Sequence, residues 1–411
     1  MFHGDPGRSG VYSGTEPRQF HRVKWKFPTG NRIVASPVIE GKTIYFGSDD
    51  GNIYAVDAES GHQVWKYLTK GAVSSTPAIA NGMLYAVSYD GKLYALNATS
   101  GATKWKFATE GERRFEAKNL HGMEPKNQTI ADVFDIYLSS PLVVEDTVYF
   151  GSGDGNVYAV GAKSGELKWK FKTGDVVHAS PAYANGLIYI GSWDSYFYAL
   201  DAATGKEKWR FHGGEDPTIH NQVGFQSSPA VVDGTVYTGC RDSNVYALDG
   251  ATGKEKWRCF NELSWVNATP AVVNGKVYFA TSDSKLFKIV DAATGKELAR
   301  QEDKAYIFSS PAVVGNTVLV GVTNGTLTAR DGTDGKLLWE YQIEKSKQNK
   351  GWALTADRQF DMPLNFHSSS HEITTIAFYR QMEMGSIFSS PLVANGVVYF
   401  GSGDGYLYAI E

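Results

Sequence analysis

A phrase of about 40 residues recurs along the chain and limits its possible fold more than any other feature. A clear copy is SSPAVVDGTVYTGCRDSNVYALDGATGKEKWR at residues 227–258. The Ser/Thr-Pro step of the phrase falls eight times, at Pro37, Pro77, Pro141, Pro181, Pro229, Pro270, Pro311 and Pro391. Its tryptophan falls at Trp25, Trp65, Trp105, Trp169, Trp209, Trp257 and Trp339, with Ala299 in the remaining copy. Repeats of this length indicate an array of one supersecondary unit, stacked so that each copy covers its neighbour's apolar face.

Each copy has the pattern of four short strands, which we name A to D in chain order. In the repeat these are SPAVV, VYFGS, NVYALD and KWKF, rich in β-branched and aromatic residues. Asp-Gly pairs such as Asp50-Gly51 and Asp154-Gly155 stand between strands B and C, where a two-residue hairpin requires positive φ. Four antiparallel strands per copy, without crossover helices, predict an all-β fold: an eight-bladed β-propeller.

The two ends of the chain predict how the ring closes. In regular copies the tryptophan lies 28 residues after the proline, but the chain stops at Glu411, before the copy that begins at Pro391 reaches strand D. The chain also opens with an unmatched D strand, VKWKF, around Trp25. We therefore expect the N-terminal strand to complete the last blade and remove an open sheet edge. The predicted organisation is an N-terminal extension at 1–22 and one propeller domain at 23–411.

The repeat signature, S-P-A-V-V followed by G-S-x-D-G-x-x-Y-A-L-D-A-x-T-G and K-W, resembles the PQQ-like repeat of eight-bladed propellers over residues 23–411. That family includes quinoprotein dehydrogenases and a non-catalytic outer-membrane assembly lipoprotein. The resemblance therefore allows a pyrroloquinoline quinone (PQQ) cofactor with Ca²⁺, for which Trp193, Asp194 and Arg241 could form part of a site. The adjacent cysteine pair of many such enzymes is missing, and no calcium ligand set can be assigned in the sequence.

Charge and hydropathy exclude two classes of partner. The net charge is −4 and no basic block is present, so nucleic acid is not expected. Apolar stretches are strand-sized, so we predict a soluble chain without a transmembrane segment and, by default, a monomer. The start MFHGDPGRSG has no signal-peptide pattern, and the resemblance implies a periplasmic or secreted location.

Cys240 and Cys259 are expected on strands B and D of one blade, with strand C between them, so we predict two free thiols.

Three long links between blades point to the functional face. The spacing from a repeat tryptophan to the next proline is 12 or 13 in regular links, but 36 after Trp105, 20 after Trp209 and 52 after Trp339. All three insertions join strand D to the next strand A, so they emerge on one face of the ring. Loops on a rigid scaffold commonly carry binding residues, and we predict that this face is the functional one.

Several polar side chains on this face depart from the repeat. Two positions before the Ser/Thr-Pro step, blades 4 to 6 have the polar His178, Gln226 and Asn267, whereas blades 3, 7 and 8 have the apolar Leu138, Phe308 and Phe388. The turn between strands B and C also has large side chains in blades 4 and 5, Trp193 and Arg241. The candidate ligand-binding residues are Arg113, Arg114, Glu116, Lys118, His121, His178, Trp193, Asp194, His220, Asn221, Gln222, Gln226, Arg241, Asp242 and Asn267.

From these residues we predict a pocket at the channel mouth in which His178, Trp193, Gln226 and Arg241 converge. An anionic or sugar-like ligand would stack on Trp193 and bind Arg241, with Arg113 or Arg114 closing over it. His178 or His220 could transfer a proton. The alternative is structural: the polar groups hydrogen-bond neighbouring links or hold water, and Trp193 packs between blades.

The functional prediction is a binding protein for a small ligand or a protein partner on the long-loop face. A quinoprotein-type oxidoreductase or another enzyme, and a pure assembly scaffold, remain alternatives. His367 and His371 are four residues apart, but the intervening SSS is a poor helix former, so we expect no metal site there.

Overall fold

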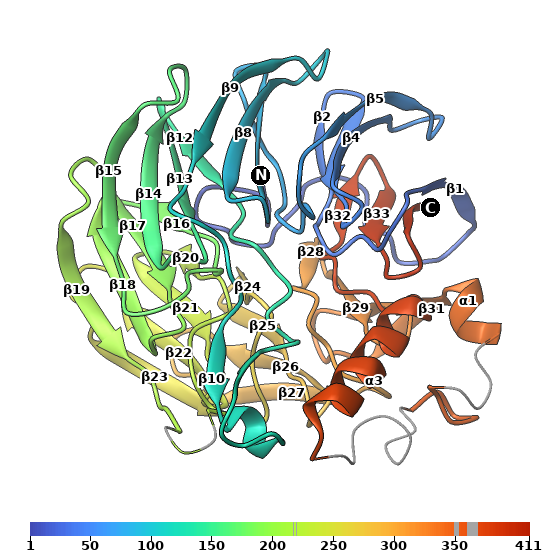
Figure 1. The fold of residues 1–411 in the computed structure, drawn as a ribbon. Coiled ribbons are helices and arrows are strands. Elements are labelled where there is room, and N and C mark those ends of the chain that lie inside the picture. Colours follow the sequence, from blue (N-terminus) through green and yellow to red (C-terminus); the bar gives the residue numbers. More distant parts are fainter. Residues whose placement is uncertain (217, 219, 349–352, 360–368) are drawn as a thin grey trace.

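Eight four-stranded antiparallel sheets surround a central channel (Figure 1), which confirms the predicted eight-bladed β-propeller. The computed structural model describes residues 1–216, 218, 220–348, 353–359 and 369–411. His367 lies outside these residues.

Each of the first four blades is built from consecutive strands. Blade 1 consists of β2 (Val38–Glu40), β3 (Thr43–Gly47), β4 (Asn52–Asp57) and β5 (Gln63–Leu68). Blade 2 consists of β6 (Ala78–Ala80), β7 (Met83–Ser88), β8 (Lys92–Asn97) and β9 (Thr103–Ala108). Blade 3 consists of β12 (Leu142–Val144), β13 (Thr147–Gly151), β14 (Asn156–Gly161) and β15 (Leu167–Lys172). Blade 4 consists of β16 (Ala182–Ala184), β17 (Leu187–Gly191), β18 (Tyr196–Asp201) and β19 (Glu207–His212).

The second half of the ring continues in the same way until the chain ends. Blade 5 consists of β20 (Ala230–Val232), β21 (Thr235–Gly239), β22 (Asn244–Asp249) and β23 (Glu255–Phe260). Blade 6 consists of β24 (Ala271–Val273), β25 (Lys276–Ala280), β26 (Leu286–Asp291) and β27 (Glu297–Glu302). Blade 7 consists of β28 (Ala312–Val314), β29 (Thr317–Val322), β30 (Thr326–Asp331) and β31 (Leu337–Gln342). Blade 8 combines β32 (Leu392–Ala394), β33 (Val397–Gly401) and β34 (Tyr406–Ile410) with the N-terminal β1 (Val23–Pro28).

The pairing of β1 with β34 closes the ring as predicted. The two strands are antiparallel, with Trp25 opposite Ala409 and Phe27 opposite Leu407. Closure removes the free edge that β34 would otherwise expose.

The repeated Ser/Thr-Pro step links neighbouring blades around the channel. The hydroxyl of the residue before the proline accepts a hydrogen bond from the backbone N–H of the equivalent residue in the preceding blade, for example from Ser36 N–H to Thr76 Oγ1 at 3.0 Å. Ser390 N–H donates in turn to Ser36 Oγ at 2.9 Å, which joins blade 8 to blade 1. The motif therefore satisfies backbone donors that strand A cannot pair within its own blade.

The repeated tryptophan packs each strand D onto the next blade. Trp169 Nε1 donates to Ala202 O at 2.9 Å, and its ring lies over Gly205, where an added Cβ would come within 2.6 Å of ring carbons. Blade 8 takes its D strand from the N-terminus and has no C–D turn. Trp339 of blade 7 donates instead to Pro17 O at 2.7 Å, so residues before β1 replace the missing turn.

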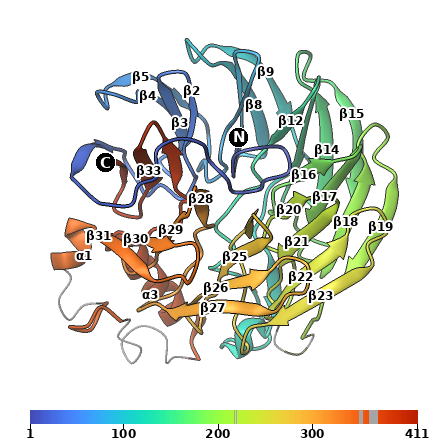
Figure 2. The same cartoon turned by 180° about the vertical axis from the view of Figure 1, so that it is seen from behind.

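The first residues of the chain run across the channel (Figure 2). Carbonyl groups of Pro6, Gly7 and Gly10 accept hydrogen bonds from A strands of blades 4, 5 and 7. The fully buried Arg8 donates to Pro181 O at 2.5 Å and Ser140 O at 3.0 Å. Residues 1–12 are thus packed against the ring at one end of the channel, whereas most of residues 13–22 are exposed.

The three insertions lie on the opposite face and form a cap, which we define as residues 109–137 and the described parts of 213–225 and 343–387 (Figures 1 and 2). The first contains the hairpin of β10 (Glu116–Lys118) and β11 (Thr129–Ala131) and the short η1 (Leu120–Gly122). The third contains α1 (Glu344–Gln348) and α3 (His371–Glu383), two helices that the repeat did not predict. No helix among the described residues is long and apolar enough to cross a membrane.

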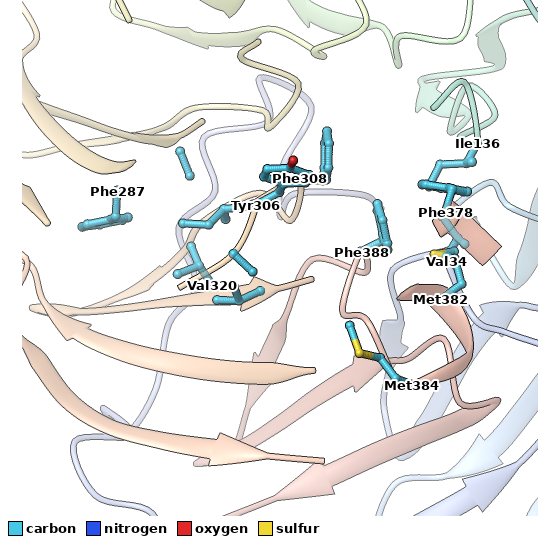
Figure 3. Close-up of a cluster of buried hydrophobic side chains, with 14 of the residues drawn as sticks. Val34, Ile136, Phe287, Tyr306, Phe308, Val320, Phe378, Met382, Met384 and Phe388 are labelled. Carbon is cyan, nitrogen blue, oxygen red and sulfur yellow. The ribbon is translucent and has the colours of Figure 1, made fainter. Parts of the chain in front are cut away.

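Helix α3 contacts the first insertion at its N-terminus and again toward its C-terminus. Ser370 caps its N-terminus by accepting from Ile373 N–H, and His371 N–H donates to Glu124 O of the first insertion at 3.0 Å. Further along, Phe378 and Met382 belong to a buried apolar cluster that also contains Ile136 of the first insertion (Figure 3).

Candidate functional site

The four residues expected to form a pocket do converge at the channel mouth, but each contacts the first insertion of the chain itself. His178 bonds to Glu112 and Asp135, Trp193 stacks on Phe115, Gln226 bonds to the Phe134 carbonyl, and Arg241 bonds to Asp132. Residues 112–135 therefore occupy the volume in which a ligand was expected. We call this segment the strap.

Arg241 lies between two aromatic faces and an acidic partner. Its guanidinium is 4.7 Å from the Trp193 ring centroid and 3.6 Å from that of Trp265, and Nη1 donates to Asp132 Oδ2 at 2.7 Å. Burial alone raises the pKa of the Asp132 carboxyl, but the charges of Arg241 and His121 hold it well below its usual range. The ring of Phe115 covers Trp193 with 4.6 Å between centroids and 12° between planes. The strap thus supplies both an anion for Arg241 and a planar group for Trp193.

A buried histidine anchors both ends of the strap. His178 Nδ1 is 2.7 Å from Asp135 Oδ1 and Nε2 is 2.9 Å from Glu112 Oε1, and all three side chains are almost fully buried. Burial alone lowers the pKa of His178, but the charges and hydrogen bonds of Asp135 and Glu112 outweigh it and raise the pKa to about 10. His178 is therefore a cation at neutral pH, and both nitrogens donate to carboxylates.

The channel below the strap is a small polar cavity of about 40 Å³, room for a few water molecules. Tyr137 lines it at the cap end and Phe2 at the N-terminal end. Gln226 Nε2 donates to Phe134 O at 2.8 Å, whereas Gln226 Oε1 and both amide atoms of Asn267 have no partner among the described residues. These amide groups face a cavity whose volume of about 40 Å³ suits water molecules but not a cofactor or a sugar.

The acidic residues of the two large turns have a structural role shared with other blades. Asp194 accepts from Tyr198 OH at 2.7 Å and from Gly174 N–H at 2.7 Å, as Asp154 does from Tyr158 OH at 2.7 Å. Asp242 accepts from Tyr246 OH in the same way. Their geometry is that of a repeat turn.

The remaining candidates lie on or near the cap surface. Arg113 pairs with Asp175 at 2.7 Å on the outside, and His121 bonds to Asp132 at 3.2 Å and to Asn221 at 3.0 Å beneath it. Glu116 and Lys118 are exposed on β10, and His220 and Gln222 are partly exposed in the second insertion. Arg114 lies close to Tyr89, with its guanidinium 6.0 Å from the ring centroid.

Sequence reasoning missed the residues that fill the pocket. Glu112, Phe115, Asp132, Asp135 and Trp265 all contribute, and none interrupts a repeat motif. The signal available was the stretch DVFD at 132–135, two carboxylates beside two apolar residues in a loop otherwise rich in polar side chains. A buried arginine and a buried histidine require anions, and this stretch offered them.

The residues at the mouth do not fit PQQ. That cofactor is planar and carries several carboxylates, so it needs a free aromatic face and free cations. Phe115 covers the Trp193 face, Asp132 occupies Arg241, and the cavity below is far too small. Within the described ranges, no group of three or more His, Cys, Asp or Glu side chains is arranged to hold a metal ion.

Comparisons with known proteins agree with this architecture. The crystal structure of BamB from Moraxella catarrhalis matches with a TM-score of 0.67 at 16% identity, over 95% of this chain and 97% of that one. The computationally designed Ika8 protein matches with a TM-score of 0.67 at 16% identity, over 93% and 97%. A europium-containing methanol dehydrogenase matches with a TM-score of 0.70 at 15% identity, over 100% and 97%. These identities show the shared fold and leave the function open.

Sequence comparison identifies the family to which the chain belongs. Curated protein sequences give no match. The profile of the family described as outer membrane protein assembly factor BamB matches residues 15–132, 134–306 and 224–411. The chain therefore belongs to this family of PQQ-like propellers.

Proposed function

We propose that the protein is a non-catalytic scaffold that binds a partner protein through the cap, in the assembly of outer membrane proteins and on the periplasmic side of that membrane. The observation that carries the proposal is the strap, because the chain's own Phe115 and Asp132 occupy the groups that would have held a small ligand. The channel below the strap is a cavity of only about 40 Å³, so we place the binding surface on the outside of the cap, where the three insertions gather (Figure 1).

The cap surface has a feature suited to a protein partner. Ile373, Ile376 and Tyr379 follow one another at three-residue spacing on α3 and are 48%, 45% and 37% exposed. Three such residues on one helix face form an apolar stripe beside polar and charged groups, which is typical of protein-binding surfaces. The family description, outer membrane protein assembly factor, supports a protein partner and a periplasmic location.

Site-specific crosslinking in the native host tests this function. A photoreactive residue at Ile376 should capture a component of outer membrane protein assembly, and Ile376→Asp should abolish binding of that component without changing the melting temperature, because the side chain is exposed. The matched control is a photoreactive residue at Leu298 on the outer strand β27, which is 49% exposed but outside the cap. Equal capture at both positions, or none at Ile376, would contradict the proposal.

The quinoprotein alternative gives a different result in a direct assay. If the strap blocks cofactor binding, then incubation with PQQ and Ca²⁺ should leave no bound cofactor absorbance after gel filtration and no dye reduction. Bound PQQ in the intact protein would favour the enzyme over the scaffold.

A further inference from the structure

Four side chains from four different elements meet on the cap beside the apolar stripe. Arg114 comes from the strap, Arg32 from the link between β1 and β2, Tyr89 from the B–C turn of blade 2, and Tyr379 from α3. The Arg32 guanidinium lies 5.0 Å from the Tyr379 ring centroid, and the Arg114 guanidinium lies 6.0 Å from that of Tyr89. Burial by itself raises the pKa of Tyr379, but hydrogen bonding and charge from Arg114, with a further contribution from Arg32, leave it below its usual value.

The two arginines differ in how their charge is balanced. Arg32 Nε bonds to Asp49 Oδ2 at 2.5 Å, whereas Arg114 has no carboxylate within 4 Å in the part of the chain that the structure describes. The acidic groups that lie near Tyr89 are Asp135 and Glu112, and both are committed to His178 in the interior.

We propose that Arg114, together with Arg32 and the Tyr379 hydroxyl, forms a carboxylate-binding site, and that its occupant is an Asp or Glu side chain of the protein that docks on the α3 stripe. This inference rests on the proposed function for its occupant, but the site itself is independent of it. A guanidinium binds carboxylates through two parallel N–H···O bonds, and such charge-assisted bonds are stronger in a partly desolvated position than on an open surface. Arg114 has this position, because it is partly buried between two tyrosines.

The stripe and the cation define the chemistry of the partner. Tyr379 is part of the apolar stripe and also contacts Arg114. A carboxylate bound at Arg114 would therefore lie at one end of the row formed by Ile373, Ile376 and Tyr379. The matching segment therefore presents apolar side chains to the row and an acidic residue at its end. The negative charge of that acidic residue is complementary to the unpaired Arg114. Such a charge pair fixes the position of the bound segment along the row more than it raises the affinity.

The site is tested on the isolated protein with acetate as the probe. Tyrosine ring carbons are labelled with ¹³C, and the Tyr379 signal is assigned by its loss in Tyr379→Phe. Acetate, titrated against chloride at constant ionic strength, should shift this signal saturably, whereas neutral acetamide of the same shape should not. Arg114→Gln should weaken acetate binding at least about tenfold, the scale of one charge-assisted hydrogen bond.

The matched control is the neighbouring arginine. Arg113 is exposed and paired with Asp175, so Arg113→Gln should change acetate affinity less than about twofold, as expected for a surface ion pair. Arg114→Lys keeps the charge without the planar fork and should give an intermediate affinity, which separates the site from a failure to fold. Equal effects of the two Gln variants, or equal shifts with acetate and acetamide, would overturn the site. Acetate binding that depends on Arg114, combined with no crosslinked partner at Ile376, would instead retain the site and refute the scaffold function.

Discussion

Replacing Asp132 by Asn tests whether the buried charge pair holds the strap in the channel mouth. Arg241 and Asp132 are 0% exposed and 2.7 Å apart. The Asn side chain has nearly the same shape and retains an oxygen for the Phe134 N–H, but it leaves the Arg241 cation buried without a counter-ion. Removing one partner of a buried pair costs about 3–5 kcal/mol. An exposed pair of the same length gives the comparison: Arg113 and Asp175 are also 2.7 Å apart but 44% and 26% exposed, so Asp175→Asn should cost only about 0.2–1 kcal/mol.

Native-state hydrogen exchange measures this difference in free energy at the strap itself. The amide of Phe115, which donates to Asp135 Oδ2 at 2.7 Å, reports the opening of the strap. In Asp132→Asn its exchange should accelerate by about two orders of magnitude or more, up to the limit set by global unfolding, and in Asp175→Asn it should change less than about fivefold. Adding Arg241→Met to Asp132→Asn removes the unpaired charge and should restore a large part of the protection. Equal exchange in the two Asn variants would show that the buried pair does not hold the strap.

Three further predictions concern the anchor, the blade contacts and the thiols. The pKa of His178 is raised from 6.5 to about 10 in the folded protein. The contribution of the charged His178 to stability is therefore complete below pH 6.5 and is lost as the pH rises toward 10. Urea unfolding at pH 6, 8 and 10 should show this loss of stability in the wild type but not in His178→Gln. Gly205→Ala should destabilise the fold by about 1–3 kcal/mol more than Gly186→Ala, because both glycines have φ above +70° but only Gly205 lies under a tryptophan ring; equal melting temperatures would contradict the role of that contact. Cys240 is buried and Cys259 is partly buried, and both are free as predicted. Burial raises the pKa of both thiols. A thiol reagent should therefore titrate two thiols in the unfolded protein and react slowly with the native protein, first at Cys259.

Much of the fold was predictable because the determining contacts repeat. The Ser/Thr-Pro hydroxyls and the strand-D tryptophans make equivalent hydrogen bonds in successive blades, and the turn glycines lie under the tryptophan rings. A motif that recurs eight times in the sequence therefore predicts the contacts that join neighbouring blades into the ring. The closure by β1 followed from counting strands. Trp339 of blade 7 departs from this pattern, because its indole N–H donates to Pro17 O and not to the C–D turn of the next blade. Pro17 lies outside the repeat, so no sequence pattern indicated this contact.

The amino-acid sequence by itself determined the blades, their number, the closing strand, and which polar residues gather at one mouth of the channel. Only the tertiary structure decided what those residues bind. Arg241 needed an anion and Trp193 a planar neighbour, and both requirements are met by a strap whose Asp132 lies 109 residues before Arg241. An insertion without periodicity gives no register, so its path across the mouth depends on packing against side chains from several blades and α3 at once, and these side chains come from positions far apart in the sequence.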